Sequence, residues 1–515
     1  MSLAITTLVT VMVWSTPIIP FYVASQVAAT TSATALSLER EAKALLESGW
    51  WSSYSNDTLQ RCNWTGISCN DAGSVIKINP PSDAIKVGGK FKNMDFSCFP
   101  NLVFLNLSSH ELNGNMEDFT FNISNLSRLT HIDLSFNYLH GRLSLRLGNL
   151  IRLEYIDFSH DQINGSIPVE IGKLKNLVTL YLNDCGLFDS IPSTLSELTN
   201  LENLDLSNNS LSGSIPSILS ELTNLKNLNL SNNFLSGSIR STLSALTNLV
   251  TLDLSFNSLS GSIPSALGKL TNLVTLDLSG NYLSGSIPSA LGKLTNLETL
   301  GLSYNSLNGS IPSALGELTN LETLDLSNNF LNDSIPSTLF QLSNLVSMDL
   351  SRNYLIGPIP SSLGFLHKLE NLLLDFNRIN ELDLSNNRIN GSIPSRIEDL
   401  KTLRVLFLHS NLLEGLIPEE IGNLEALTLL NLSQNELSGP IPPQIGKCSN
   451  LEELDLSNNN LEGLVPAEIE KLQTLYRVDL RNNNFSGMEI IIMQVLLVMK
   501  QMVRYLGRYL VATEI

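Results

Sequence analysis

The pattern L-x-x-L-x-L-x-x-N recurs at a fixed 24-residue spacing through most of this chain. Its clearest copies are Leu249–Asn257, Leu273–Asn281, Leu297–Asn305 and Leu321–Asn329. In the first copy, the alternation of a strand is expected to point Leu252 and Leu254 into the core and Asp253 toward solvent. One such unit buries almost nothing alone. The pattern therefore predicts a stack of equivalent coils whose leucines form one continuous apolar column.

The last residue of the pattern is a framework asparagine, placed where the chain leaves the strand. Its amide both donates and accepts hydrogen bonds, so it can satisfy backbone groups that lose their ladder partners at the bend. The sequence has 17 such positions, at 110, 137, 161, 185, every 24 residues to 377, and then 387, 411, 435, 459 and 483. Fourteen are Asn, and the exceptions are His110, Asp161 and Cys185.

A second signature, G-x-I-P, follows the asparagine in copies such as Gly213–Pro216 and Gly285–Pro288. Glycine permits a tight bend, isoleucine packs inward, and proline restrains the next segment, which reads P-S-x-L-G-x-L-T-N-L. Together with L-D-L-S before the asparagine, these motifs closely resemble the plant-specific class of leucine-rich repeat, over about Leu102 to Gly487. The resemblance implies an α/β solenoid, a right-handed superhelix with a parallel inner β-sheet and short helical or 3₁₀ outer turns.

The period breaks once, because Asn377 and Asn387 are only ten residues apart. Ten residues cannot complete a coil. Three explanations are open: residues around Phe376 to Glu381 bulge out, the chain carries a deletion, or the gene model is faulty.

The net charge of -18 limits the classes of partner. Nucleic acid and anionic membranes attract basic surfaces, so neither is expected as the principal partner. A cationic or neutral partner fits better.

The N-terminal segment has the character of a secretory signal peptide. Residues 1–38 contain no charged side chain, and the apolar stretch from Leu3 to Trp14 is followed by small residues. We expect a signal peptide over residues 1–35, cleaved between 24 and 35, and hence a secreted or plasma-membrane-associated protein at the cell surface or in the apoplast. Because no Lys or Arg precedes the apolar stretch, a retained anchor is the alternative.

Residues 36–100 are expected to form an N-terminal cap. A helical stripe runs from Leu36 to Trp50, with Ser37 placed to cap the helix. The segment Cys62–Cys69 matches the C-x-W-x-G-x-x-C cap of plant leucine-rich repeat ectodomains, and this resemblance implies a disulfide between Cys62 and Cys69. Such a bridge stabilises the cap by roughly 2 to 3 kcal/mol.

About 16 or 17 repeats are expected over residues 101–487, with an atypical tail over 488–515. The apolar part of the tail is too short to span a bilayer, and Lys500, Arg504 and Arg508 would oppose insertion of a longer segment. The tail either caps the last repeat, lies on a membrane surface, or is an artefactual terminus.

Thirteen N-x-S/T sequons occur, which an Asn- and Ser-rich repeat also generates by accident. The predicted glycosylation sites are Asn56, Asn63, Asn122, Asn125, Asn164, Asn308, Asn332 and Asn390. Asn106, Asn229 and Asn431 lie mid-strand on the inner face, where a glycan would obstruct a ligand.

No catalytic constellation is present in the sequence. The six histidines have no metal-ligand spacing, and there is no phosphate loop or kinase motif. We therefore expect no enzyme activity, no metal and no cofactor.

Candidate ligand contacts are the departures from the repeat consensus on the concave face. The mid-strand row is rich in Asp, for which a scaffold role is favoured over recognition of a basic ligand. An aromatic series also flanks the framework asparagines, and its alternative role is packing against the adjacent coil. The predicted ligand contacts are His131, Tyr155, Tyr181, Tyr304, Tyr354, Phe376, Arg404, Phe407 and His409.

The order of signal peptide, cysteine cap and repeats resembles the ectodomain of a plant leucine-rich repeat receptor-like kinase. The stretch from Leu38 to Asn113 resembles in particular the male-discoverer-interacting receptor-like kinase group. The resemblance implies a secreted peptide or protein ligand on the concave face and a co-receptor kinase at the cell surface.

The chain departs from this group because it has no spanning helix, C-terminal cysteine pair or kinase, so we do not expect it to signal alone. Two alternatives are open. One is a secreted inhibitor of microbial cell-wall hydrolases, similar to polygalacturonase-inhibiting proteins, and the other is a non-functional truncated receptor.

Overall fold

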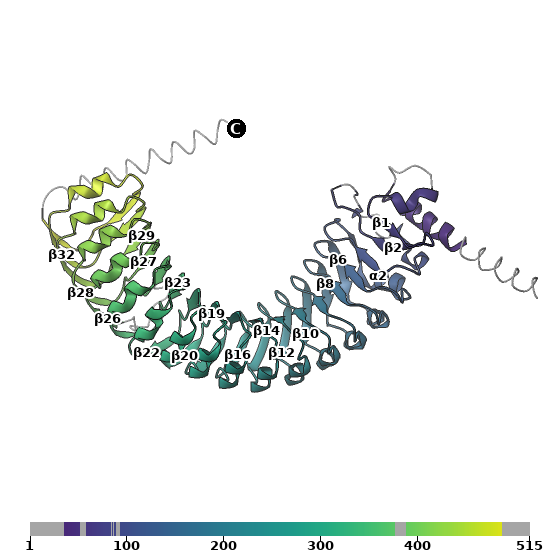
Figure 1. Cartoon of the computed structure of the whole chain (residues 1–515), viewed down its shortest axis with the longest axis horizontal. Coiled ribbons are helices and arrows are strands. Elements are labelled where there is room, and N and C mark those ends of the chain that lie inside the picture. The colour runs from purple at the N-terminus through teal and green to yellow at the C-terminus, as the bar shows by residue number, and fades with distance from the viewer. Residues whose placement is uncertain are drawn as a thin grey trace, which may run out of the picture.

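The computed structural model describes residues 36–51, 58–83, 85, 87–88, 93–375 and 388–486. These residues form one open arc, with the N-terminal cap at one end and the last coils at the other (Figure 1). The expected parallel solenoid is confirmed. Within the described ranges, no helix has the length and apolar character needed to cross a membrane.

The concave side of the arc is a parallel sheet to which each coil adds one short strand. It belongs to an 18-stranded sheet that includes β1 (Ile67–Cys69) and β2 (Val75–Ile78) of the cap. Equivalent residues of adjacent coils pair, as Leu252 does with Leu276. The repeat strands are β3 (Phe104–Asn106), β5 (His131–Asp133), β7 (Tyr155–Asp157), β9 (Thr179–Tyr181), β11 (Asn203–Asp205), β13 (Asn227–Asn229), β15 (Thr251–Asp253), β17 (Thr275–Asp277), β19 (Thr299–Gly301), β21 (Thr323–Asp325), β23 (Ser347–Asp349), β25 (Asn371–Leu373), β27 (Val405–Phe407), β29 (Leu429–Asn431), β31 (Glu453–Asp455) and β33 (Arg477–Asp479).

A second parallel sheet, which the sequence did not predict, begins just after each bend. It has a 10-stranded part from β4 to β22 and a 6-stranded part from β24 to β34, joined by a bridge between Ser334 and Ile356. Its strands are β4 (Asn113–Asn115), β6 (Tyr138–Arg142), β8 (Gln162–Gly165), β10 (Gly186–Ser190), β12 (Ser210–Ser214), β14 (Phe234–Ser238), β16 (Ser258–Gly261), β18 (Tyr282–Gly285), β20 (Ser306–Ser310), β22 (Phe330–Asn332), β24 (Ile356–Pro358), β26 (Arg388–Gly391), β28 (Leu412–Leu416), β30 (Glu436–Gly439), β32 (Asn460–Gly463) and β34 (Asn484–Phe485).

The convex side is built from short 3₁₀ turns, and α2 (Met116–Ile123) takes this place in an early coil. Most turns begin after a proline in extended conformation, as at Pro264. The turns are η4 (Leu145–Asn149), η5 (Val169–Lys173), η6 (Ser193–Glu197), η7 (Ser217–Glu221), η8 (Ser241–Ala245), η9 (Ser265–Lys269), η10 (Ser289–Lys293), η11 (Ser313–Glu317), η12 (Ser337–Gln341), η13 (Ser361–Phe365), η14 (Ser395–Asp399), η15 (Glu419–Asn423), η16 (Pro443–Lys447) and η17 (Ala467–Lys471).

In many 3₁₀ turns the fourth position is a glycine that faces the next coil at very short range. A Cβ added to Gly268 would lie 2.2 Å from the backbone oxygen of Ala290, and one added to Gly292 equally close to that of Ala314. Such an approach requires glycine in these coils. Other coils place larger residues in this slot, including a buried Phe340.

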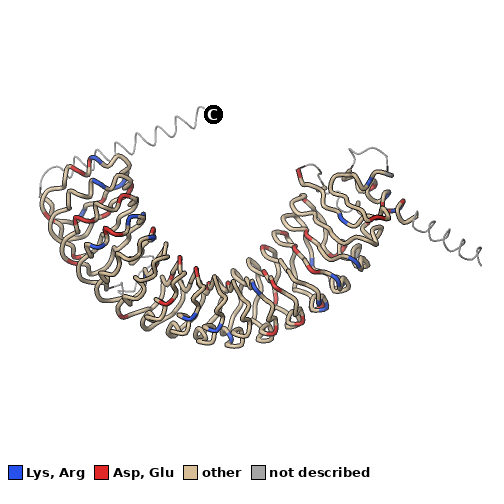
Figure 2. Tube along the Cα trace, in the orientation of Figure 1, with Lys and Arg blue, Asp and Glu red and all other residues tan. Residues whose placement is uncertain are grey.

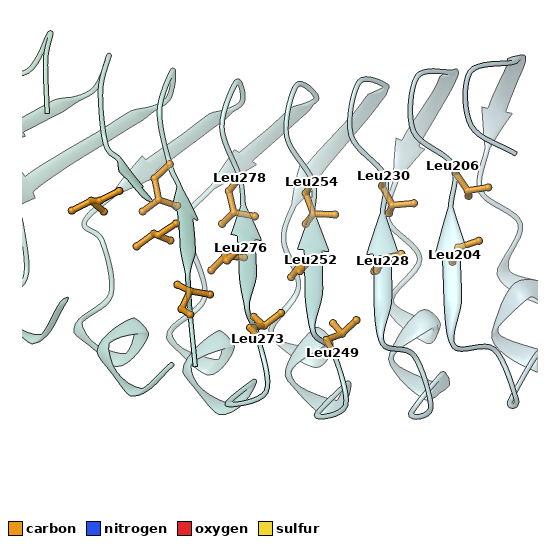
Figure 3. Packing of buried hydrophobic residues seen from close by; sticks show 14 of the residues in the cluster. Leu204, Leu206, Leu228, Leu230, Leu249, Leu252, Leu254, Leu273, Leu276 and Leu278 are labelled. Atoms are coloured by element: carbon orange, nitrogen blue, oxygen red, sulfur yellow. The ribbon is translucent and has the colours of Figure 1, made fainter. Parts of the chain in front are cut away.

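The leucines of the frame form the continuous core that the repeat predicted. Leu252 and Leu254 are fully buried, and their equivalents in neighbouring coils point to the same side of the inner sheet (Figure 3). Burying one such side chain stabilises the fold by roughly 1.5 to 3 kcal/mol. Because every coil repeats this contribution, stability accumulates along the arc.

The framework asparagines form a buried ladder beside this core. The Nδ2 atom of Asn257 donates to the backbone oxygens of Leu230, Leu254 and Ser255 at 2.9 to 3.2 Å. Its Oδ1 accepts from the backbone N–H of Leu235 at 3.0 Å. The expected role at the bend is confirmed, since one amide satisfies both its own coil and the preceding one.

The break in the period is absorbed by one long coil. Strand β25 pairs directly with β27, so Asn371 lies opposite Val405 across 34 residues of chain instead of 24. The Nδ2 atom of Asn411 correspondingly donates to the Leu374 oxygen at 2.9 Å. Residues 376–387, which hold the second copy of the frame, lie outside the described residues.

The N-terminal cap closes the column with a helix, whose described part spans 36–47, the 3₁₀ turn η1 (Thr58–Asn63) and the Cys62–Cys69 disulfide. A buried carboxylate, Glu41, ties this helix to the sheet by accepting from the Ser74 hydroxyl at 2.5 Å and the Val75 N–H at 2.9 Å. The disulfide implied by the resemblance is present.

Candidate functional site

The concave face carries the predicted row of mid-strand carboxylates, and acidic residues recur along the inner edge of the arc (Figure 2). The Oδ1 atom of Asp253 accepts from the backbone N–H of Ser255 at 2.9 Å and from its hydroxyl at 2.7 Å. The same pair of bonds recurs at Asp133, Asp157, Asp205, Asp325 and Asp455. These bonds give the row the scaffold role that the sequence analysis favoured.

The early coils hold a ladder of aromatic contacts, in which the rings of Phe104, His131 and Tyr155 occupy the first position of their inner strands. The Phe104 and His131 rings stack at 4.0 Å between centroids, and His131 and Tyr155 stack at 4.2 Å. The Lys77 ammonium lies 4.6 Å from the centre of the Phe104 ring, and Tyr181 meets Tyr155 edge-on at 6.2 Å. We call these five residues the ring ladder. It joins cation–π and aromatic contacts in one surface across β2 to β9.

Burial decides the charge of the ring ladder. Burial, and secondly the positive charge of Lys77, lower the pKa of His131 to about 4. The pKa of Tyr155 is raised, first by burial and then by the Asp157 carboxylate, to which its hydroxyl donates at 3.3 Å. At neutral pH, both rings are uncharged and Lys77 is the cation of the ladder.

The sequence analysis grouped His131, Tyr155 and Tyr181 but missed Phe104 and Lys77. The sequence could have identified Phe104, because it occupies the same position of its frame as His131. The two residues pair in the sheet. Lys77 comes before the first repeat, and β2 pairs with β3 to place it opposite Phe104.

The predicted contacts of the late coils do not form one exposed patch. Arg404 is exposed and Phe407 half-buried, but His409 is buried, so its expected exposure is wrong. His409 directly follows Leu408, and most other coils have a buried Ser at this position. Phe376 lies outside the described residues.

The buried His409 contacts a second buried residue of the long coil. Its Nε2 atom lies 3.4 Å from Asp375 Oδ2. Burial raises the pKa of Asp375 to about 7. Both residues occupy the Ser position of their frames, so this pair is a structural contact beside the break rather than a ligand surface.

The aromatic series beside the framework asparagines is largely exposed. Tyr304 is 55% exposed, whereas Tyr354 is half-buried and stacks against Phe330 at 5.8 Å between ring centroids. The ring of Phe256 lies over Gly280, where a Cβ would come within 2.7 Å of it. Packing against the adjacent coil therefore accounts for part of this series, but more than half of the Tyr304 side chain still faces solvent.

The predicted glycosylation sites that the structure describes lie at the surface. Asn63, Asn125, Asn164, Asn308, Asn332 and Asn390 are exposed, and Asn122 is half-buried in α2. Asn56 lies outside the described residues.

The described residues hold no group of three or more His, Cys, Asp or Glu side chains placed to bind a metal ion. Two of the three free thiols, Cys185 and Cys448, stay protonated for a physical reason. Burial raises the pKa of Cys448 to about 11 and that of Cys185 to about 12, so both stay protonated.

Comparison with known proteins agrees with this architecture. A leucine-rich repeat region model matches residues 107–286, a leucine rich repeat model matches 271–331, 319–379 and 378–437, and a further one matches 450–472. Comparison with curated proteins gives no match.

Three solved structures show where similar solenoids occur. The plant peptide hormone receptor RGFR1, in complex with RGF2, has 29% identity over 83% of this chain and 84% of that chain, with a TM-score of 0.67. A TDR receptor has 31% identity over 76% of this chain and 73% of that chain, with a TM-score of 0.61. The Arabidopsis receptor kinase HAESA, in complex with the peptide hormone IDA and the co-receptor SERK1, has 27% identity over 88% and 90%, with a TM-score of 0.52.

The chain belongs to the leucine-rich repeat proteins. Its repeat domain is of the kind that plant leucine-rich repeat receptor ectodomains carry.

Proposed function

We propose that this chain is an extracellular ligand-binding ectodomain in plant signalling or defence, and that it binds a secreted peptide or protein on its concave face. The structural relatives support this proposal, because RGFR1 and HAESA are described as complexes with peptide hormones. The SERK1 co-receptor in the HAESA complex supports a co-receptor kinase as a second partner at the cell surface.

The single observation that carries the peptide-binding proposal is the ring ladder. It presents half-buried aromatic surface on rigid strands of the concave face, with the hydroxyl of Tyr155 as a polar group at its edge. Preorganised rings of this kind are typical anchors for a partner side chain. The acidic rows beside the ladder favour a cationic or neutral peptide over an acidic one.

The finer features belong to the same proposal. Secretion through the N-terminal segment and glycosylation at the exposed sequons fit an extracellular receptor protein. Membership of the male-discoverer-interacting group has its support in the resemblance over Leu38–Asn113. Arg404 and Phe407 are proposed as a secondary contact in the late coils.

The test is calorimetric titration of the purified protein with a panel of secreted plant peptides. We expect Tyr155→Ala to weaken the best binder by roughly ten-fold or more, because truncating an anchor ring typically costs more than 1 kcal/mol. Tyr282→Ser is the matched control, since it removes an exposed ring outside the concave face.

Two results would count against the proposal. A folded protein that binds no peptide of the panel would remove its basis, and so would a Tyr155→Ala variant that binds with unchanged affinity. Inhibition of a fungal polygalacturonase by the same preparation would instead favour a hydrolase inhibitor.

A further inference from the structure

A second surface, separate from the concave face, carries one exposed aromatic residue in each of five consecutive coils. Its members are Phe234, Phe256, Tyr282, Tyr304 and Phe330, with exposed fractions between 47% and 66%. We call this set the aromatic strip. It runs along the side of the arc on which the chain passes from the inner sheet to the second sheet.

The strip has two rows that are staggered by one coil. Phe234, Tyr282 and Phe330 open strands β14, β18 and β22 of the second sheet, so these rings recur on every second strand. Neighbouring strands lie about 4.8 Å apart, which separates successive rings by about 10 Å. Phe256 and Tyr304 lie on the intervening coils, one residue before the framework asparagine.

Each ring of the strand row stands opposite a small polar residue. Phe234 pairs with Ser212, Tyr282 with Ser260, and Phe330 with Asn308. Every unit of this strand row therefore offers a flat apolar ring beside a hydroxyl or amide that can donate and accept a hydrogen bond.

The strip is also free of charge. Strands β12 to β22 contain no Lys, Arg, Asp or Glu. In a protein of net charge -18, this makes the strip an electrically neutral face beside an acidic concave one.

The other row has a left-handed backbone, which recurs at the same position in most coils. Phe256 and Tyr304 adopt left-handed conformations, with φ of 50° and 52°, whereas Asn232 and Asn328 fill this position in neighbouring coils.

We propose that the aromatic strip binds a neutral, extended carbohydrate chain. The flat faces of pyranose rings are apolar and their edges carry hydroxyls, which matches rings that alternate with Ser and Asn side chains. The spacing of two strands is close to the length of one disaccharide unit in an extended β-1,4-linked chain. This site is independent of the peptide site on the concave face.

Other partners fit this surface less well. Single-stranded nucleic acid also stacks on rows of aromatic rings, but it needs a cationic groove, which strands β12 to β22 lack. The core of a protein interface is largely apolar, whereas the exposed residues between these rings are Ser and Asn.

The predicted glycans would leave most of the strip open. Asn332 lies on the same strand as Phe330, and the sequons that border the rest of the strip are Asn208 before Phe234 and Asn308 beside Phe330. The face of the second sheet between these two asparagines carries no sequon. An external chain can therefore reach the rings from Phe234 to Tyr304.

The test is affinity electrophoresis of the full chain in gels that contain a soluble β-1,4-linked glucan or a β-1,4-linked galactomannan. Wild-type protein should be retarded, and the Tyr282→Ser, Tyr304→Asn double variant should bind roughly ten-fold more weakly, because it removes two stacking rings. Both substitutions insert the residue that neighbouring coils carry at the same position, so the variant is expected to fold. Tyr155→Ala is the matched control, and it should be retarded like the wild type.

Three results would overturn the proposal. They are absence of retardation of the wild type by both polymers, equal retardation of the double variant, and equal retardation by acidic polygalacturonate. Peptide titration of the same variants distinguishes failure of this proposal from failure of the peptide-binding proposal. Tyr282→Ser should leave peptide binding unchanged whether or not the strip binds carbohydrate.

Discussion

Asp161 occupies a framework asparagine position, and replacing it with Asn should stabilise the protein. Its Oδ1 atom accepts from the backbone N–H of Leu139 at 2.7 Å, as an asparagine oxygen does in other coils. Its Oδ2 atom is buried and has no hydrogen-bond partner among the described residues. By equivalence with Asn257, this second oxygen takes the place of an amide that donates to backbone carbonyls.

The size of the effect follows from the proton that this carboxyl must keep. Burial raises the pKa of Asp161 from 3.8 to about 8. Below pH 3.8, both the folded and the unfolded chain hold the proton, and the site does not lower the free energy of unfolding. As pH rises from 3.8 to 8, the unfolded chain releases its proton while the folded chain retains it, so stability falls throughout this window. At pH 7, the loss reaches about 4 kcal/mol, an upper bound because local relaxation admits water.

Asp161→Asn should recover roughly 2 to 4 kcal/mol at pH 7 and little at pH 4. Urea unfolding followed by tryptophan fluorescence is a suitable assay, because Trp50, Trp51 and Trp64 all lie in the nearby cap. Long repeat arrays do not always unfold in one step, so the transition of the N-terminal coils should be analysed separately.

The converse substitution, Asn257→Asp, is the matched control. It should introduce the same pH-dependent loss of stability in a coil that lacks a framework Asp. The difference in unfolding free energy from wild type should therefore be negative for Asn257→Asp and positive for Asp161→Asn. A pH-independent difference between Asp161→Asn and wild type would refute the reasoning, and so would a variant that is less stable than wild type at pH 7.

Three further predictions concern other contacts. Asn411→Ala should destabilise the long coil by about 2 to 4 kcal/mol, because it removes the bond to Leu374 and leaves buried carbonyls unsatisfied; faster hydrogen exchange confined to neighbouring coils would show this. Replacing Cys62 and Cys69 with Ser should cost the cap roughly 2 to 3 kcal/mol, read from its tryptophan fluorescence in urea, and unchanged unfolding would contradict it. The lowered pKa of His131 means that this side chain alone contributes a loss of stability as pH drops from 6.5 toward 4, opposite in sign to the contribution of Asp161; His131→Phe should therefore become more stable relative to wild type on acidification through this window, and a pH-independent difference in thermal melts would contradict it.

The frame made the core predictable, because each of its positions recurs in the same environment in every coil. Leu252, Leu254 and Asn257 needed only their place in the pattern. His409 was misjudged because its chemical character was weighed above its place in the frame, where the other coils bury a Ser. The position alone would have predicted its burial.

The remaining features depend on contacts that the period does not specify. The second sheet comes from short segments whose Ser-rich sequences carry no strong strand pattern. Lys77 joins the ring ladder from the cap, and the sheet pairing between β2 and β3 places it there. The path across the break follows from the pairing of β25 with β27, which the ten-residue interval between Asn377 and Asn387 did not reveal.

The close approach of Gly268 to the next coil gives the convex turns a further role. Backbone bonds hold the inner strands at a nearly constant separation of about 4.8 Å, so the gap between the backs of adjacent coils sets the radius of the arc. Glycine lets the backs of adjacent coils approach closely, whereas the coil with Phe340 buries a large side chain in the same position and needs more room. The curvature of the whole arc can thus be changed by mutation at a single convex residue per coil, which would alter the width of its opening while every side chain of the concave face stays the same.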